Sequence, residues 1–139
     1  MENKINFRSD CPISSALDIV GDKWSLLILR DILMLGKRTF KEFSSADEHI
    51  SSSILANRLL KLEELQIILK RPHPSNKKVF EYFVTEKGAD FIPIMVELIL
   101  WSNKHLQEHI AKEAHQFALQ IIKNKQLIIS QIRESNKFN

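Results

Sequence analysis

The sequence predicts a mainly α-helical fold with one small β-hairpin. Glycine and proline are scarce, with three and four copies among 139 residues, which is typical of a chain with few turns. Apolar residues recur at intervals of three and four over most of the chain, which is the spacing of one helix face. Residues 67–84 differ, since two β-prone runs flank a polar turn there. We expect one domain, residues 1–139, around a single core.

Caps and glycines delimit the helices that are expected before the hairpin. The expected helices are residues 12–20, with Cys11 as cap and Gly21 as end; 23–35, capped by Asp22 and ended by Gly36; a short helix from a Thr39–Glu42 capping box, with Phe40 and Phe43 turned inward; and 51–64, capped by Ser51.

Two helices are expected after the hairpin. Thr85 caps a long helix, in which Pro93 predicts a kink. One amphipathic helix then covers about residues 108–133. Its apolar side is broader than a chain of this length needs to cover, so we expect residues 106–139 to form a dimerisation helix. The alternative is that this apolar side belongs to the core of the chain itself.

The order of short helix, turn, helix and hairpin is typical of a winged helix-turn-helix. In this fold the second helix of the motif enters the major groove of DNA, and the first helix braces it against the backbone. The hairpin, called the wing, reaches adjacent phosphates. The sequence therefore predicts binding to double-stranded DNA.

The helix over residues 51–65 is the expected recognition helix. On a helical wheel, its larger apolar residues share one half, and these are Ile54, Leu55, Leu59, Leu62 and Leu65. The other half carries Ser52, Ser53, Asn57 and Lys61, whose side chains suit base edges and phosphates. An asparagine can bond adenine with two hydrogen bonds. An ordinary solvated helix face has the same composition, and the outward Leu60 suits a thymine methyl, packing on the wing or simple exposure.

Basic residues gather on the predicted hairpin. Lys77 and Lys78 lie at its tip, and Lys70 and Arg71 lie at its base. The chain carries a net charge of +3 with a pI near 9.0. Residues 37–87 hold ten Lys and Arg against seven Asp and Glu, so this segment contains the whole excess of 10 − 7 = +3. A cluster of this kind favours phosphate contacts by the wing.

Other classes of protein lack support in the sequence. One cysteine excludes an internal disulfide, and neither a signal peptide nor a membrane span is present, so we expect a cytoplasmic protein. No phosphate loop, nucleophile elbow or His-Glu-x-x-His motif occurs, so we expect neither an enzyme nor a cofactor. His105, His109 and His115 are interpreted as residues of a polar face, with no metal site.

Several segments together resemble the HxlR-type helix-turn-helix regulators, which are relatives of the MarR winged-helix group. The similar segments are residues 11–12, 16–24, 27–30, 38–43, 50–51, 55, 58–59, 62–63, 81–88 and 101. The resemblance covers about residues 10–105, the expected family core. The chain departs from the family pattern at Asp22, where a second glycine is usual, at Leu60, which is often basic, and at Gln66, where a glycine usually ends the recognition helix.

The resemblance implies a bacterial transcriptional regulator that acts as a homodimer through N- and C-terminal dimerisation helices. A pseudo-palindromic operator would fit such a dimer. The resemblance places Ser51, Ser52, Ser53, Asn57 and Arg58 on the recognition helix and Arg38 beside the DNA backbone. On the wheel Arg58 borders the buried half, so it either braces the motif or reaches a phosphate rather than reading a base.

Cys11 is the candidate sensor residue. Some members of the family detect oxidants or electrophiles through an N-terminal cysteine before a proline, as in Cys11-Pro12. A helix N-terminus stabilises the thiolate, the form that oxidants attack, and nearby Arg8 would add to this effect. The alternative is an inert cap. Because the chain has no second cysteine, a disulfide would form between subunits or with a small thiol.

The rival function is a winged-helix module for protein–protein interaction. It would share the fold, the core and the dimer, but would not require Asn57, Lys61, Lys77 and Lys78 on one face. Charge reversal at the tip of the wing distinguishes the two functions.

Overall fold

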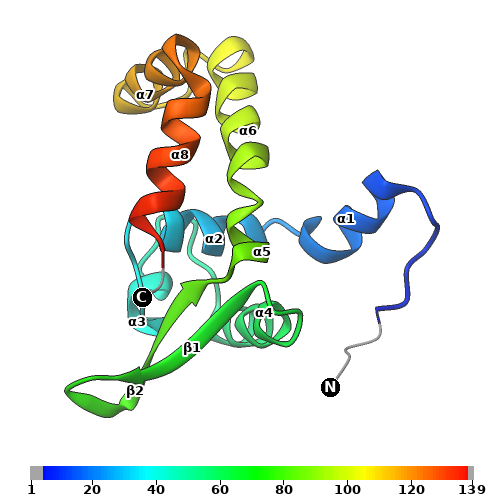
Figure 1. Cartoon of the computed structure of the whole chain (residues 1–139), viewed down its shortest axis with the longest axis vertical. Coiled ribbons are helices and arrows are strands. Elements are labelled where there is room, and N and C mark those ends of the chain that lie inside the picture. The colour runs from blue at the N-terminus through cyan, green and yellow to red at the C-terminus, as the bar shows by residue number, and fades with distance from the viewer. Residues whose placement is uncertain (1–4, 138–139) are drawn as a thin grey trace. The chain divides into compact units, whose positions relative to one another are not determined.

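The computed structural model describes residues 5–137 of the chain. Its elements, shown in Figure 1, are α1 (Pro12–Val20), α2 (Ser25–Leu33), α3 (Phe40–Ser44), α4 (Ser52–Glu64), β1 (Ile68–His73), β2 (Asn76–Val84), α5 (Glu86–Ala89), α6 (Ile92–His105), α7 (Lys112–Lys123) and α8 (Lys125–Ser135). They fall into two units, one up to Gly88 and one from Ala89 onward. The mainly helical fold with a two-stranded wing is confirmed.

The predicted residues close α2 and cap α3. Gly36 adopts a φ of +68°, which favours glycine, and closes α2 because the next N–H, that of Lys37, bonds the Asp31 carbonyl at 2.9 Å. The Thr39–Glu42 capping box is present at the start of α3. α2 itself is shorter than the predicted 23–35, since Asp22 caps the turn before Ser25.

Unit 1 has its core between α2, α3, α4 and the base of the hairpin. Its fully buried side chains include Leu29, Ile32, Phe43, Leu55, Leu62, Ile67 and Ile68. Two inward assignments are wrong, because Phe40 is 36% exposed and Ile54 is 37% exposed. Both stand in the first turn of a helix, where side chains lean toward the N-terminus and so project past its end.

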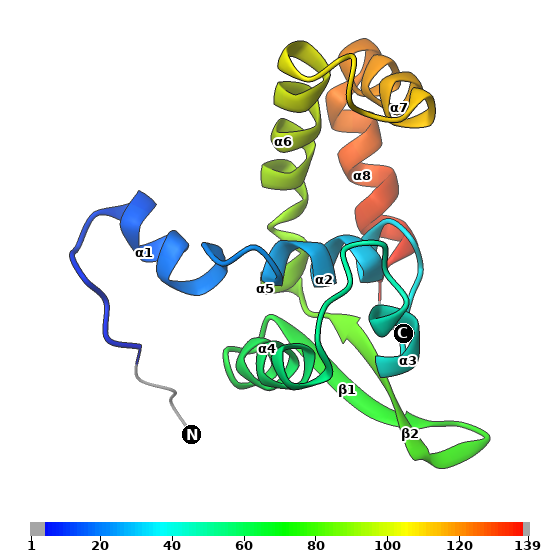
Figure 2. The same cartoon turned by 180° about the vertical axis from the view of Figure 1, so that it is seen from behind.

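The wing is a long antiparallel hairpin. Ile68 lies opposite Val84 and Lys70 opposite Tyr82, and the register shifts at Pro72 and His73. β1 packs on α4 and β2 on α2, as the view from behind in Figure 2 shows. β2 begins at Asn76, earlier than the predicted turn allowed, so Lys77 and Lys78 lie in the first residues of this strand.

α1 stands apart from the core of unit 1. Both views show it extending away from α2 (Figures 1 and 2). Val20 is its one buried residue, whereas Ile13 and Leu17 are 72% and 53% exposed. This helix therefore presents an apolar side that its own unit does not cover.

Unit 2 consists of α6, α7 and α8, which pack pairwise on one another. The predicted kink at Pro93 is wrong. The helix capped by Thr85 is the single turn α5, and a new helix starts at Ile92. Pro93 is the second residue of α6, where its missing N–H costs no hydrogen bond.

The single helix expected over residues 108–133 is also wrong. Asn124 has an extended φ of −157° and separates α7 from α8. Its side chain accepts a hydrogen bond from the Leu127 N–H at 3.1 Å and so caps α8. Ala118 and Ile121 of α7 are fully buried, so part of the predicted apolar stripe belongs to the core of unit 2.

The exit from α4 predicts a stabilising substitution. Gln66 adopts a φ of +59°, a left-handed conformation that glycine adopts at little cost. We expect Gln66→Gly to raise the free energy of unfolding by about 0.5–1 kcal/mol in denaturant titrations. Ala56→Gly, inside α4, is the control and should lower the free energy of unfolding by about 1 kcal/mol. A loss of stability in Gln66→Gly would contradict this account.

Candidate DNA interface

The N-terminus of α4 carries three consecutive exposed serines. The Ser51 hydroxyl caps the helix by accepting a hydrogen bond from the Ile54 N–H at 3.3 Å. It also lies 3.5 Å from the Ser53 hydroxyl. Ser52 and Ser53 are exposed on the first turn. Small hydroxyls at a helix N-terminus combine little steric bulk with N–H groups that favour anions, so they suit an approach to phosphates.

Asn57 and Arg58 are held together on the next turn of α4. The Arg58 Nη1 donates to Asn57 Oδ1 at 2.9 Å, and its Nε donates to Asp22 Oδ2 at 3.0 Å. Asn57 is exposed and Arg58 half-buried. The structure therefore supports a bracing role for Arg58.

The Asp22 carboxylate accepts hydrogen bonds from three residues. Its carboxylate accepts from the Ser25 hydroxyl at 2.6 Å, the Ser25 N–H at 2.9 Å and the Trp24 N–H at 3.0 Å, in addition to Arg58. Partial burial by itself would raise the pKa of Asp22. The hydrogen bonds and the charge of Arg58 outweigh burial and lower that pKa. The side chain is therefore a stable anion beside the recognition helix.

Lys61 is tied to α1. It is half-buried, and its Nζ donates to the Asp18 carbonyl at 3.2 Å. The Asp18 carboxylate pairs with Arg8 at 2.6 Å, and hydrogen bonding from the Arg8 N–H is the largest cause of its lowered pKa. Lys61 thus links α4 to the end of α1.

Arg38 lies at the base of the wing. Its backbone carbonyl accepts from the Tyr82 N–H at 2.7 Å, and its Nη1 donates to the Ile32 carbonyl at 3.3 Å. The guanidinium stacks over Phe83 at 4.8 Å, and Arg71 stacks over the same ring at 4.4 Å. Burial is the largest cause that lowers the pKa of Arg38. Stacking on the Phe83 ring therefore holds Arg38 and Arg71 at the base of the wing.

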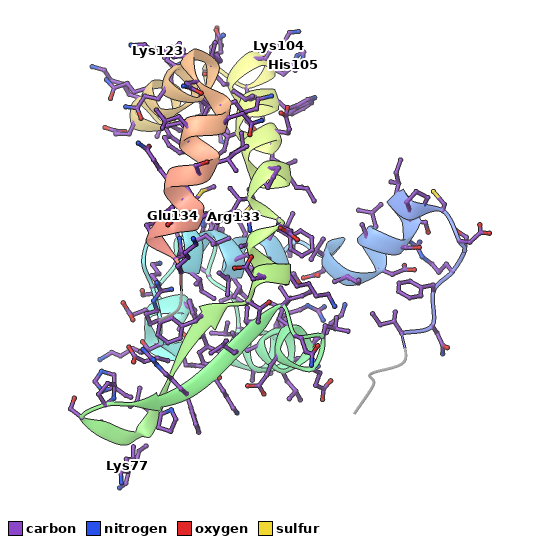
Figure 3. The ribbon with its side chains drawn as sticks, viewed as in Figure 1. Lys77, Lys104, His105, Lys123, Arg133 and Glu134 are labelled. Atoms are coloured by element: carbon purple, nitrogen blue, oxygen red, sulfur yellow. The ribbon has the colours of Figure 1, made fainter. Side chains whose placement is uncertain are left out.

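Lys77 and Lys78 are exposed next to the two-residue turn of the wing. Lys77 projects from the end of the hairpin into solvent (Figure 3). At the base, Lys70 lies over the Phe80 ring at 4.6 Å and 3.9 Å from Glu63. Within unit 1, the structure thus places the serines, Asn57 and the wing lysines on the surface, and it engages Arg38, Arg58 and Lys61 in contacts within the protein.

Cys11 is exposed at the N-cap position of α1. Its thiol makes no capping hydrogen bond, and Pro12 follows as the first residue of the helix. The guanidinium of Arg8 pairs with the Asp18 carboxylate at 2.6 Å. An exposed thiol at this place is open to reagents in solution.

The three histidines differ in exposure, since His105 and His109 are exposed and His115 is not. His115 is half-buried, and its Nδ1 lies 2.6 Å from Oδ1 of the buried Asn103. The exposed His105 places its ring 5.1 Å from that of Trp101. Within residues 5–137, no group of three or more His, Cys, Asp or Glu is placed to hold a metal ion. No helix in the same residues is long and apolar enough to span a membrane.

An exposed apolar stripe on α6 was not predicted from the sequence. Ile94, Leu98 and Trp101 follow the spacing of one helix face and are 45%, 51% and 58% exposed. The spacing of these residues in the sequence could have revealed the stripe. However, an apolar helix face has the same spacing when it is buried in the core, and the sequence does not show which residues cover it. The Asp22–Arg58 contact was also missed, since it joins residues far apart in sequence.

Comparison with known proteins identifies a helix-turn-helix family to which the chain is similar. A family model described as HxlR-like helix-turn-helix matches residues 19–110. The HTH-type transcriptional regulator YodB of Bacillus subtilis (strain 168) is 33% identical over 95 residues, which cover 68% of this chain and 84% of YodB.

Solved structures of transcriptional regulators are also similar. PA1607 aligns with a TM-score of 0.64 and 32% identity, over 76% of this chain and 70% of its own. YodB from B. subtilis in its reduced form aligns with a TM-score of 0.57 and 31% identity, over 73% of this chain and all of its own. YodB has also been solved after diamide treatment and with quinone bound. The chain belongs to the HxlR-like helix-turn-helix family of transcriptional regulators.

Proposed function

We propose that the protein is a sequence-specific DNA-binding regulator in which both units act together within a homodimer. The observation that carries the proposal is the exposed polar surface of unit 1. Ser52, Ser53 and Asn57 project from the second helix of the motif, and Lys77 and Lys78 project from its wing. In this fold, the helix reads base edges and the wing contacts phosphates.

Charge reversal on the wing tests DNA binding. We expect the double variant Lys77→Glu, Lys78→Glu to bind all DNA sequences more weakly, because the wing contacts phosphates and not bases. The slope of log affinity against log salt should become shallower by roughly one unit for each phosphate that the wing no longer neutralises. Titrating labelled duplexes from upstream of the gene, and random duplexes, at several salt concentrations gives both quantities.

Lys104→Glu, Lys123→Glu provides a matched control, because both lysines are exposed in unit 2 (Figure 3) and the charge change is the same. This control should retain most of the affinity. Equal losses in the two double variants would contradict a specific role for the wing. No effect of the wing variant would favour the protein–protein interaction module.

The homodimer rests on apolar surface that the chain leaves uncovered. The α6 stripe of Ile94, Leu98 and Trp101 lies in unit 2, and Ile13 and Leu17 lie on α1. A second copy of the chain would cover these surfaces and would place two recognition helices on the two halves of a pseudo-palindromic operator.

A charge in the α6 stripe tests the dimer. We expect Leu98→Asp to shift the protein toward monomer, because association would bury an unpaired carboxylate. Analytical ultracentrifugation over a range of concentrations measures the shift. Leu35→Asp is the control, since Leu35 is 58% exposed and belongs neither to α1 nor to the α6 stripe. An unchanged dimer in Leu98→Asp would place the interface elsewhere.

We further propose that Cys11 makes DNA binding sensitive to thiol oxidants or quinones. Exposure of the thiol at the start of α1 supports this proposal, as do the diamide-treated and quinone-bound structures of YodB. Diamide would take two electrons and two protons from two thiols. The resulting disulfide would join Cys11 of two chains, or Cys11 and a small thiol.

Diamide treatment tests the sensor. We expect oxidised wild type to lose affinity for its specific duplex, and a reducing agent to restore that affinity. Cys11→Ser should bind with or without diamide. Non-reducing gel electrophoresis shows whether the disulfide joins two chains. Equal sensitivity of wild type and Cys11→Ser would refute the role of this cysteine and leave the DNA-binding proposal intact.

A further inference from the structure

Asn57, the exposed amide of the proposed recognition surface, is fixed by a relay of hydrogen bonds that begins outside α4. We propose that Asp22, acting through Arg58, sets the orientation of the Asn57 amide and so selects the base that Asn57 reads. This inference rests on the DNA-binding function proposed above. Asp22 is a positioning residue in it, because it acts on DNA through its neighbours.

The chemistry of arginine determines the orientation of the amide. A guanidinium has donors and no acceptor, so the Asn57 atom that lies 2.9 Å from Arg58 Nη1 is the oxygen. The amide nitrogen, Nδ2, therefore faces the other way. Nδ2 has no hydrogen-bond partner among residues 5–137, and the side chain is exposed. Asn57 accordingly offers two N–H donors to a ligand, while one of the two lone pairs of its acceptor oxygen is engaged by a cation.

An amide with this orientation distinguishes guanine from adenine. In the major groove guanine presents two acceptors, O6 and N7, which suit a donor. Adenine presents the acceptor N7 beside the donor N6, so its two-bond pairing with asparagine needs the amide oxygen as acceptor. In this structure Arg58 occupies one of the two lone pairs of Oδ1, so adenine N6 would have to donate to the other lone pair, beside a guanidinium whose charge repels its N–H. Asn57 therefore favours guanine, whereas an asparagine without this neighbour favours adenine.

Asp22 is what keeps Arg58 in place. Its Oδ2 is held by two backbone N–H groups, those of Trp24 and Ser25, and it accepts from Arg58 Nε at 3.0 Å. The ion pair is mostly covered, with side-chain exposures of 27% for Arg58 and 20% for Asp22. Because Nε and Nη1 of the guanidinium are both engaged, Arg58 has little freedom to release Asn57.

Selection from a random duplex library tests the inference. The proteins compared are wild type, Asn57→Ala, Asp22→Ser and, as a charge-matched control, Asp47→Ser, at an exposed aspartate of the turn after α3. Asn57→Ala identifies the position that Asn57 reads, because its preference disappears there. At this position we expect wild type and Asp47→Ser to select guanine. Asp22→Ser should shift the ratio of guanine to adenine roughly tenfold toward adenine, the worth of one good base contact.

A second variant separates the relay from the folding of α2. Arg58→Ala breaks the relay but leaves the hydrogen bonds between Asp22 and the start of α2, and circular dichroism checks that each variant is folded. The same shift toward adenine in Arg58→Ala supports the relay. Unchanged preference in folded Asp22→Ser and Arg58→Ala would overturn the inference while the DNA-binding function stands. If wild type selects no sequence at all, both the function and the inference fail.

Discussion

The outward surface of α4 depends on the burial of its other side. Leu55, Leu59 and Leu62 are at most 3% exposed, and burial of each side chain is worth roughly 1.5–3 kcal/mol. Turning the helix by one residue would bring these leucines toward solvent, so their packing fixes which residues face outward. Ser53 and Asn57 owe their exposure to this constraint. Packing of the apolar core thus determines which polar side chains α4 exposes.

The five cations of unit 1 that were predicted to contact DNA divide into two groups. In the first group, Arg58 bonds Asp22 and Lys61 bonds the Asp18 carbonyl near the end of α1. Arg38 belongs to the same group, since it stacks on Phe83 of the wing. Lys77 and Lys78 stay exposed. Long-range attraction to a polyanion would therefore come mainly from the wing, and α4 would contribute short, weakly charged groups suited to discrimination. Separating attraction from discrimination allows each to change without the other.

Features set by local chemistry were predicted well from the sequence. Gly36, the Thr39–Glu42 box and Ser51 each act within a few residues, and the structure has these helix ends as predicted. Features set by distant partners were missed or wrong. The break at Asn124, the fate of the α6 stripe and the contact of Arg58 with Asp22 depend on what packs nearby, which spacing alone does not reveal. Asp22 itself was noticed, but as a helix cap and a departure from the family pattern.

The small buried area of α1 has a consequence for when this helix exists. A helix of nine residues is too short to be stable in water alone, and α1 buries Val20 and is tied to α4 by the Lys61 hydrogen bond near its end. In the homodimer proposed above, a second copy would cover Ile13 and Leu17 and would supply much of the burial that orders this helix. Folding of the N-terminal segment and association would then be one equilibrium. The surroundings of Cys11 would accordingly depend on protein concentration as well as on the sequence.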